Sequence, residues 1–296
     1  MSRFKVATAA YPLGVFDQWD GYAAKIREWV VEAAGQGSDL LLFPEYGALE
    51  LATLDGTAVS SNAASCLQAT SNYVPRSNEL HSALAQEFGV TIVGGSAPVL
   101  ENGVMVNRAP VFGPEGTISY QDKQIMTRFE RDPWAIEGGE PLQIFDTPVG
   151  KLGILTCYDS EFPLLGRALV EAGAEVILVP SCTEGLEGYW RVRIGAMSRA
   201  LEGQCVTVMA SLVGDRPEIS GMETNTGMGG VFGPPDEGFP PTGVIAEGTL
   251  GQPGWTYGEI DLGKVRAVRA DGHVLNASHW GEQVGRDGKP DHILVK

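Results

Sequence analysis

Residues 151–181 read KLGILTCYDSEFPLLGRALVEAGAEVILVPS, and our prediction of the fold begins with them. The apolar run at the start predicts a buried strand, residues 162–172 have the spacing of a helix, and EVILVPS predicts a second buried strand. A strand, a helix and another strand in this order are typical of α/β proteins, in which helices cover the faces of a largely parallel sheet.

The same alternation continues on both sides of this unit. Strands are predicted at residues 4–10, 39–45, 104–112, 117–123, 205–213 and 255–262, and helices at residues 22–33, 78–88 and 189–202. The turn at 113–116 predicts an antiparallel hairpin, so the fold includes mixed strand pairing. Because the strands are too long and too apolar to have an exposed face, we expect two mixed β-sheets packed together under outer helices. No linker-like segment divides the chain, and we expect one domain over residues 1–296.

The charge balance bears on the partners of this protein. There are 21 lysines and arginines against 37 aspartates and glutamates, which gives a net charge of −16. Nucleic acids and anionic membranes require a basic surface, so we expect neither as a partner. No run of about 18 apolar residues is present, and the start, MSRFKVATAAYPLG, lacks the apolar core of a signal peptide. We therefore expect a cytoplasmic protein.

The cysteines and histidines give no sign of a metal site. The four cysteines include no Cys-x-x-Cys pair, and none of the four histidines lies at ligand spacing from another. We therefore expect no metal ion. We interpret Cys66, Cys182 and Cys205 as small buried apolar residues.

Three polar residues come at or directly after the ends of predicted strands, where α/β proteins gather functional groups. They are Glu45, Lys123 and Cys157. Taken singly, each has an ordinary explanation, as a turn cap, a solvated edge charge and a small core residue, respectively. Together they meet a chemical requirement, because a carboxylate can take the proton of a thiol and an ammonium can stabilise the negative charge that develops when the thiolate attacks.

Three segments carry a resemblance to a known family. LLLFPEYGALEL, YQDKQ and LGILTCYDSEFP resemble the Glu, Lys and Cys signature segments of the nitrilase superfamily of carbon–nitrogen hydrolases. Their order and spacing agree with that family, and the resemblance extends through nearly the whole chain. It implies an α/β fold with a four-layer α-β-β-α sandwich, a Glu45–Lys123–Cys157 triad without a metal ion or organic cofactor, and a homodimer or higher homo-oligomer.

Members of this family commonly carry a second active-site glutamate shortly after the lysine. This chain offers Glu130 and Glu137. We prefer Glu130, because Glu137 directly precedes Gly138 and Gly139, where a turn is expected.

The residues after the cysteine indicate the branch of the family. Tyr158 and Asp159 are similar to those of amidase-like branches, whereas members with true nitrile activity usually have Trp-Glu there. The resemblance therefore implies hydrolysis of a small amide, of aliphatic, ω-amide or N-carbamoyl type, through a thioester on Cys157. We expect Lys123 and the backbone N–H of Tyr158 to bind the oxyanion.

The substrate pocket and the exact reaction stay open at this point. Aromatic and acidic side chains of the surrounding loops are candidates for the pocket walls: Tyr46, Trp134, Glu184 and Tyr189. Glu161 either places a charge at a helix N-terminus or disfavours anionic substrates. Three other functions are open: hydrolysis of a nitrile through a thioimidate, acyl transfer to an acceptor other than water, and a non-catalytic α/β interaction protein in which Cys157 is only core.

Overall fold

The computed structural model describes residues 2–286 and 288–295 of the chain. Its strands are β1 Arg3–Pro12, β2 Leu40–Leu42, β3 Thr91–Val93, β4 Ala97–Glu101, β5 Val104–Phe112, β6 Ile118–Asp122, β7 Ile136–Glu137, β8 Phe145–Thr147, β9 Gly150–Ile154, β10 Val176–Ser181, β11 Val206–Val213, β12 Gly230–Phe232, β13 Val244–Glu247 and β14 Gly254–Asp261. The α-helices are α1 Trp19–Gly35, α2 Thr57–Ser60, α3 Ala63–Phe88, α4 Arg128–Arg131, α5 Pro163–Glu171, α6 Leu186–Gly203, α7 Leu262–Asp271 and α8 Asn276–His279. The 3₁₀ helices are η1 Gly47–Asp55, η2 Cys157–Glu161 and η3 Trp280–Gln283.

The strands of the described residues join into one curled, mixed sheet of 14 strands, whose main path runs β4-β5-β3-β2-β1-β11-β10-β9-β8. We expected two separate sheets, and β1 explains the difference. In the main path β1 lies between β2 and β11: its residues 6–8 pair parallel with β2, and its last residues, 10–12, pair parallel with β11, while residues 3–10 pair antiparallel with β14. The long first strand therefore connects two halves that the sequence alone suggests are separate. The predicted mixed α/β fold is confirmed, whereas one domain over residues 1–296 stays a prediction.

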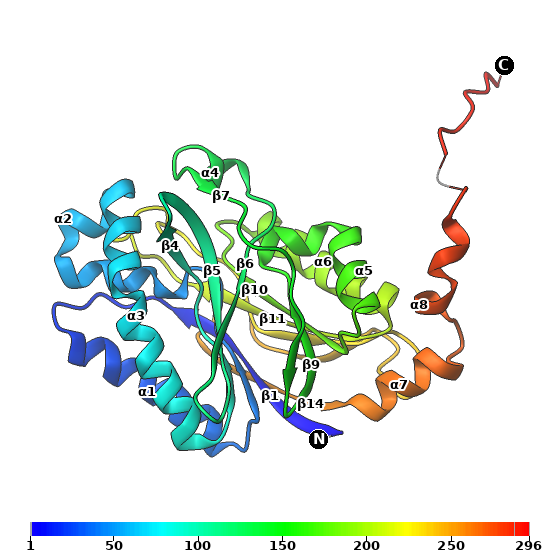
Figure 1. Ribbon diagram of the computed structural model, residues 1–296, viewed down its shortest axis with the longest axis horizontal. Helices are drawn as coiled ribbons and strands as arrows, with labels where there is room; N and C mark the ends of the chain where they lie inside the picture. Colours follow the sequence, from blue (N-terminus) through cyan, green and yellow to red (C-terminus); the bar gives the residue numbers. More distant parts are fainter. Residues whose placement is uncertain (1, 287, 296) are drawn as a thin grey trace.

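Both faces of the central strands are buried, as the uninterrupted apolar runs predict. In β1, Val6 packs into a core between the two halves of the sheet, while its neighbour Ala7 packs under α1 and α3. In β10, Leu178 lies in the same central core and Ile177 in a third core under α5 and α6. Successive side chains of a strand point to opposite faces, so each strand contributes to two cores. Figure 1 shows α1 and α3 on one side of the strands and α5 and α6 on the other.

The helix predicted at residues 78–88 is part of a much longer helix, α3, which begins at Ala63. Pro75 lies inside it and removes one backbone N–H donor, which disfavours a continuous helix in the sequence. Packing overrides this preference, because buried residues such as Leu67 and Leu84 occur on both sides of the proline. Asn62 caps the N-terminus by accepting the N–H of Ser65.

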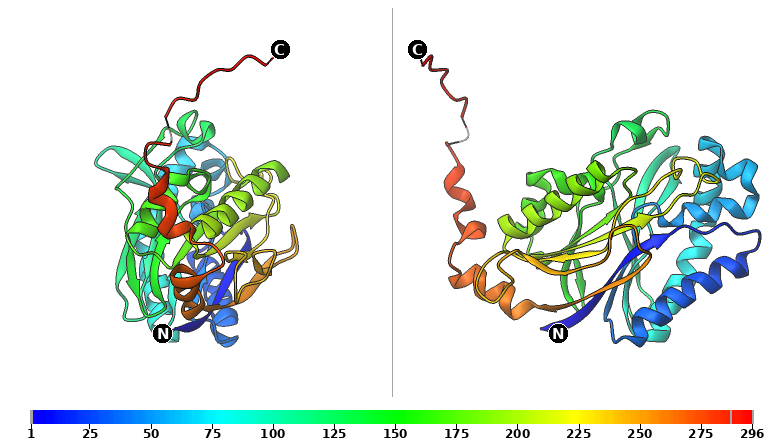
Figure 2. Two further views of the ribbon diagram at one scale, coloured as in Figure 1. Left: turned by 90° about the vertical axis from the view of Figure 1, so that its right-hand side faces the viewer. Right: turned by 180° about the vertical axis from the view of Figure 1, so that it is seen from behind.

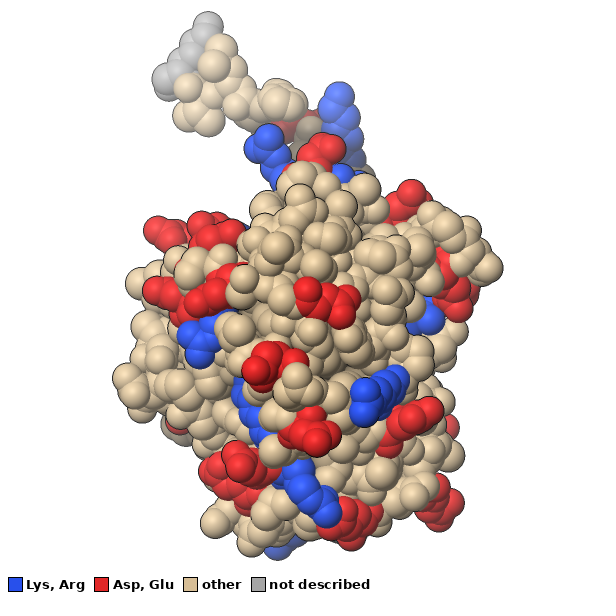
Figure 3. Space-filling model, turned by 90° about the vertical axis from the view of Figure 1, so that its left-hand side faces the viewer, with Lys and Arg blue, Asp and Glu red and all other residues tan. Residues whose placement is uncertain are grey.

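Three further features concern the surface charge, the path of the chain after α8 and the hydropathy of the helices. Figure 3 shows acidic and basic side chains interspersed over the face that it presents. After α7 and α8 the chain leads away from the strands, as Figure 2 shows from two sides. Within the described ranges, no helix combines the length and the hydropathy that a membrane span requires.

Candidate active site

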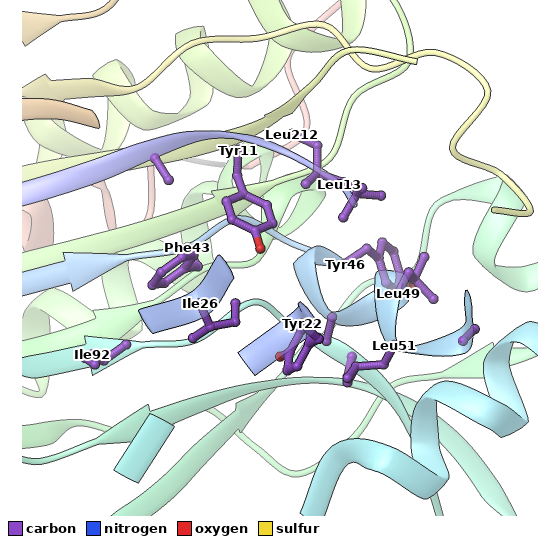
Figure 4. Packing of buried hydrophobic residues seen from close by; sticks show 14 of the residues in the cluster. Tyr11, Leu13, Tyr22, Ile26, Phe43, Tyr46, Leu49, Leu51, Ile92 and Leu212 are labelled. Carbon is purple, nitrogen blue, oxygen red and sulfur yellow. The ribbon is translucent and has the colours of Figure 1, made fainter. Parts of the chain in front are cut away.

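Glu45 and Tyr46 lie on the turn between β2 and η1. The sequence predicts that Glu45 ends its strand. In the structure β2 ends at Leu42, so Glu45 lies three residues beyond the strand. Tyr46 adopts a left-handed backbone conformation with φ 56°, and its N–H donates to Ser96 Oγ at 2.9 Å. Figure 4 shows Tyr46 beside Leu49, within the apolar cluster that holds this turn. The turn is therefore fixed by both hydrogen bonding and packing.

Lys123 lies between two buried carboxylates. It follows directly after β6, as predicted, and its side chain is only 1% exposed. Its Nζ donates to Glu45 Oε1 at 2.8 Å and to Glu130 Oε2 at 2.6 Å. The ammonium thus links the base that we predicted to the second glutamate.

Glu130 is held in place by the short helix α4. Thr127 and Glu130 form a capping box, in which the Glu130 carboxylate accepts the N–H of Thr127 at 2.9 Å. The hydroxyl of Tyr46 donates to Glu130 Oε1 at 2.7 Å. Glu137, the other candidate, is exposed in β7. The structure therefore brings Glu130, and not Glu137, into contact with Lys123.

Asn107 is a site residue that our sequence analysis missed. Its Nδ2 donates to Glu45 Oε1 at 2.9 Å and lies 3.3 Å from Glu130 Oε1, while its Oδ1 accepts from Ser96 Oγ at 2.7 Å. The sequence did carry a signal, because asparagine is uncommon in the middle of an apolar strand such as VMVNRAPVF. A buried amide in that position requires polar partners.

Cys157 begins the 3₁₀ helix η2, three residues beyond the end of β9. Our prediction that it ends the strand is therefore wrong in this detail. Its φ of 49° places it in the left-handed region, an unusual conformation for a residue with a Cβ. Its thiol is 3.6 Å from the carbonyl oxygen of Cys182 and near enough to Glu45 for each group to shift the pKa of the other.

Cys182 also lies at the site, whereas we had interpreted it as a core residue. Its N–H donates to Glu45 Oε2 at 3.0 Å, so its backbone contacts both Glu45 and Cys157. Its own thiol lies 3.9 Å from Met222 Sδ and 3.6 Å from Asn225 Oδ1. A cysteine at position 182 does not predict these contacts, because they are made by backbone atoms. They arise because Cys182 directly follows the end of β10.

Asp159 connects the loop of Lys123 to the loop of Cys157. Its buried carboxylate accepts the backbone N–H groups of Gln124, at 3.1 Å, and Ile125, at 2.8 Å. The adjacent residue, Tyr158, has a backbone N–H that meets no acceptor within the described part of the chain. This free donor lies in the first turn of η2, directly after Cys157.

The buried charges shift one another's pKa values. Burial raises the pKa of Glu45 to about 7, against the opposing effect of Lys123. Burial also raises the pKa of the Cys157 thiol well above its ordinary value, and the nearby Glu45 adds to this effect. Burial would lower the pKa of Lys123, but Glu45 and Glu130 outweigh it and raise that pKa. Likewise Lys123 outweighs burial at Glu130 and lowers its pKa.

The candidate pocket residues separate into two groups. Trp134 packs edge-on against Tyr46, with ring centroids 5.1 Å apart, and its buried Nε1 has no partner among the described residues. Tyr189 is buried, but its hydroxyl accepts from Arg193 at 3.0 Å. Glu184 is exposed. Of the four candidates, Tyr46 therefore contacts the cluster around Lys123, through Glu130, and Trp134 packs against Tyr46.

Glu161 takes part in a different interaction from the two that we considered. It ends η2, and its carboxylate lies 3.4 Å from Arg191 Nε of α6. No side-chain hydrogen bond caps α5. Its charge is thus partly balanced by a neighbouring helix.

The arrangement suits proton transfer and nucleophilic attack. A thiol stands beside a carboxylate whose pKa is near neutrality, and a permanent cation lies within the same cluster. Within the described ranges, no group of three or more histidine, cysteine, aspartate or glutamate side chains could hold a metal ion. The chemistry that these residues themselves offer is attack by sulfur on an electrophilic carbon.

Comparisons with known proteins show which proteins this chain resembles. A family model described as "Carbon-nitrogen hydrolase" matches residues 5–237. Probable hydrolase YhcX of Bacillus subtilis (strain 168) is 33% identical over 271 residues, which cover 91% of this chain and 52% of that protein. Omega-amidase NIT2-B of Xenopus laevis is 30% identical over 144 residues, which cover 46% of this chain and 52% of that protein. The chain thus spans about half the length of these curated relatives.

A solved structure shows the same fold. Nit3 of Saccharomyces cerevisiae, described as a member of branch 10 of the nitrilase superfamily, has a TM-score of 0.71 at 21% identity. The similarity covers 91% of this chain and 94% of that one, so the two proteins share their overall fold.

Proposed function

The chain belongs to the carbon–nitrogen hydrolase family, within the nitrilase superfamily, and on this premise we propose that it hydrolyses the C–N bond of a small amide. One observation carries the proposal: the Lys123 ammonium joins Glu45 and Glu130 beside the Cys157 thiol. The similarity to an omega-amidase and the Tyr158-Asp159 pair support an amide over a nitrile.

The first half of the proposed reaction forms a thioester. Glu45 takes the proton of the Cys157 thiol, and the sulfur forms a bond to the amide carbonyl carbon while the carbonyl electron pair moves to oxygen. The tetrahedral adduct collapses, the C–N bond breaks, and Glu45 returns the proton to the departing nitrogen. Because the raised pKa keeps the resting thiol neutral, deprotonation accompanies attack and does not precede it.

The second half releases the acid. Water enters, gives a proton to Glu45 and attacks the thioester carbon; collapse then breaks the C–S bond and returns the proton to sulfur. Glu130 keeps Lys123 in position through a 2.6 Å contact. Lys123 and the free N–H of Tyr158 are the proposed donors to the oxyanion in both halves.

Product analysis with matched blanks tests this proposal. Purified protein is incubated with short aliphatic amides, ω-amides and N-carbamoyl amino acids, and ammonia and the acid are measured. Cys157→Ala serves as the blank, with Cys66→Ala as a matched control at a buried cysteine away from the site. We expect turnover in the wild-type and Cys66→Ala proteins alone. Equal ammonia from Cys157→Ala would refute the assigned nucleophile.

Further substrates separate the competing functions. Faster turnover of nitriles than of the matching amides would favour a thioimidate route. Hydroxamate formed when hydroxylamine competes with water would show how readily the acyl group passes to other acceptors. A non-catalytic protein predicts that native Cys157 resists iodoacetamide, whereas the proposed site predicts faster alkylation of Cys157 than of Cys66 and Cys205, which have no adjacent lysine–glutamate pair.

Two structural expectations belong to this proposal. A four-layer α-β-β-α arrangement is supported by three successive cores, one in the centre and one under each helix pair. Assembly into at least a dimer is supported by large apolar side chains exposed on α5 and α6, where Leu164 is 74% and Ile194 is 59% exposed. Sedimentation of the wild-type protein and of a Leu164→Asp, Ile194→Asp variant tests the second expectation.

A further inference from the structure

A partly open cavity lies apart from the candidate active site. It is a cavity of about 250 Å³ between α3 and the strands β4, β5 and β6. Apolar side chains form much of its wall: Ala48, Val74, Ala97, Val99 and Pro110. Ligand sites in proteins are concave, mostly apolar and supplied with a few polar groups, and this cavity has that composition.

Helix α3 presents one continuous face to the cavity. Val74, Ser77, Asn78 and His81 all line it, and their spacing places them on a single side of the helix. The His81 ring is held by a stacked contact with Phe112, with centroids 5.3 Å apart. The His81 ring is therefore held in place before a ligand binds, which lowers the entropy cost of binding.

The cavity lies on the opposite side of β5 from the catalytic carboxylates. Asn107 points toward Glu45, and the next residue, Arg108, lines the cavity. Successive side chains of a strand point to opposite faces. A ligand in the cavity would therefore be separated from Cys157 by the strand itself.

Several polar groups on the cavity wall make no hydrogen bond to the described part of the chain. His81 Nδ1 is paired with the carbonyl oxygen of Ser77 at 2.8 Å, which makes Nδ1 the protonated nitrogen and leaves Nε2 as an acceptor. Burial lowers the pKa of His81 to about 4, so the ring is neutral at pH 7. Within the described part of the chain, neither His81 Nε2, the Asn78 amide nor the Tyr120 hydroxyl makes a hydrogen bond.

The one cation on the wall is already neutralised. Arg108 donates to Asp122 at 2.7 and 2.9 Å and to Glu101 at 2.8 Å. Its guanidinium also stacks over the Tyr120 ring, 3.7 Å from the centroid. An anionic ligand would gain little from a cation with two carboxylate partners, so the cavity favours an uncharged molecule.

From these features we infer that the cavity is a binding site for a small, uncharged aromatic alcohol whose hydroxyl donates to His81 Nε2. The volume suits one substituted ring, since a cavity of about 150 Å³ can hold benzene. The Asn78 amide and the Tyr120 hydroxyl are placed to pair with a second polar substituent. The site is independent of the amide hydrolysis proposed above.

Binding of phenol and anisole to the whole protein tests this inference. The two probes have the same ring, but anisole has no hydroxyl proton. Titration followed by calorimetry or ligand-observed NMR is expected to give one saturable phenol site, with anisole weaker by roughly threefold to tenfold, the value of one neutral hydrogen bond. Absence of saturable phenol binding would overturn the inference.

Variants locate the site. Val74→Phe fills the cavity from α3 and is expected to abolish phenol binding, while Val31→Phe, the same change at an exposed position of α1, leaves it intact. His81→Phe keeps a ring and is expected to remove the preference for phenol over anisole. Unfolding curves show that each variant is folded before binding is compared.

A last variant separates the cavity from the catalytic site. Phenol is expected to bind Cys157→Ala and the wild-type protein equally well, because β5 lies between the two sites. Loss of binding in Cys157→Ala, or retention of full binding in Val74→Phe, would place the phenol elsewhere and contradict the inference.

Discussion

Two buried lysine–glutamate clusters in this molecule use the same residue types differently. Lys25 pairs with Glu50 at 2.6 Å, and Glu50 also accepts from the Tyr11 hydroxyl at 2.6 Å. Lys123 pairs with two carboxylates, Glu45 and Glu130. Burial lowers the pKa of Lys25, whereas the two carboxylates raise that of Lys123. The first cluster balances its charges and the second does not.

The imbalance of charge supports the catalytic role that we propose for the Lys123 cluster. With one cation for two carboxylates, a second negative charge is unfavourable in a buried site, so Glu45 readily accepts a proton near neutral pH. Glu50 has no competing carboxylate and holds the start of η1 to β1 and α1. The comparison therefore predicts a functional role for Lys123 and a structural role for Lys25.

Replacing each lysine by methionine is expected to give the largest difference. Lys123→Met removes an oxyanion donor, so kcat should fall by a factor on the order of 10²–10³. Lys25→Met should leave the kcat of the folded protein nearly unchanged while lowering its stability. Steady-state kinetics and denaturant unfolding of both variants check this. Similar losses of kcat in both would remove the distinction between the clusters.

Glu50→Gln should reduce stability and spare catalysis. Glu50 is fully buried, and removing its charge leaves Lys25 without its partner. Removing one partner of a buried ion pair lowers the free energy of unfolding by at least about 3 kcal/mol. We expect this lower value here, because the Lys25 side chain is 17% exposed. Urea unfolding measures the free energy. A variant with wild-type stability but reduced kcat would contradict the structural role.

The pH dependence tests the imbalance directly. Glu45 must be ionised to take a proton, and its pKa is about 7, so kcat/KM should fall about tenfold for each pH unit below 7. Glu130→Gln removes a charge that raises this pKa, and the acidic limb should then move to lower pH. Glu137→Gln, at an exposed glutamate, is the matched control and should leave the limb in place.

The smallest effect is expected at the hydroxyl of Tyr46. Tyr46→Phe removes its 2.7 Å hydrogen bond to Glu130 and keeps the ring that packs on Trp134. We expect kcat/KM to fall by roughly threefold to tenfold, the value of one hydrogen bond. Tyr73→Phe removes a similar bond, to Asp55 at the surface, and should change nothing measurable in turnover. Equal effects of the two would mean that Tyr46 acts only through packing.

Much of the fold could be predicted because the spacing of apolar residues along the sequence shows which face of each strand or helix is buried. The alternation of strands and helices and the hairpin before Lys123 follow from local patterns, and the structure contains them. The connection of both halves through β1, which pairs with β2 and with β11, could not be predicted, because pairing partners depend on tertiary contacts. The first half of α3 was missed because Pro75 argues against a helix that packing nevertheless stabilises.

Some residues of the candidate site could be predicted from the sequence, and others could not. Glu45 and Lys123 could be named from residue type and strand position, and Glu130 from the resemblance to the nitrilase superfamily; the structure brings the three together. Asn107 could have been suspected only weakly, because asparagine is uncommon in the middle of an apolar strand. The backbone of Cys182 has none, since any residue at the end of β10 would offer the same N–H and C=O.

The left-handed conformations of Tyr46 and Cys157 have a consequence for engineering. A side chain in this region costs on the order of 1–2 kcal/mol, and glycine avoids that cost. A selection that rewards heat resistance alone would therefore favour glycine at position 157, which yields a sturdier protein without a nucleophile. At position 157, therefore, a change that raises thermostability removes turnover. Libraries that include these two turns should be screened for both properties at once.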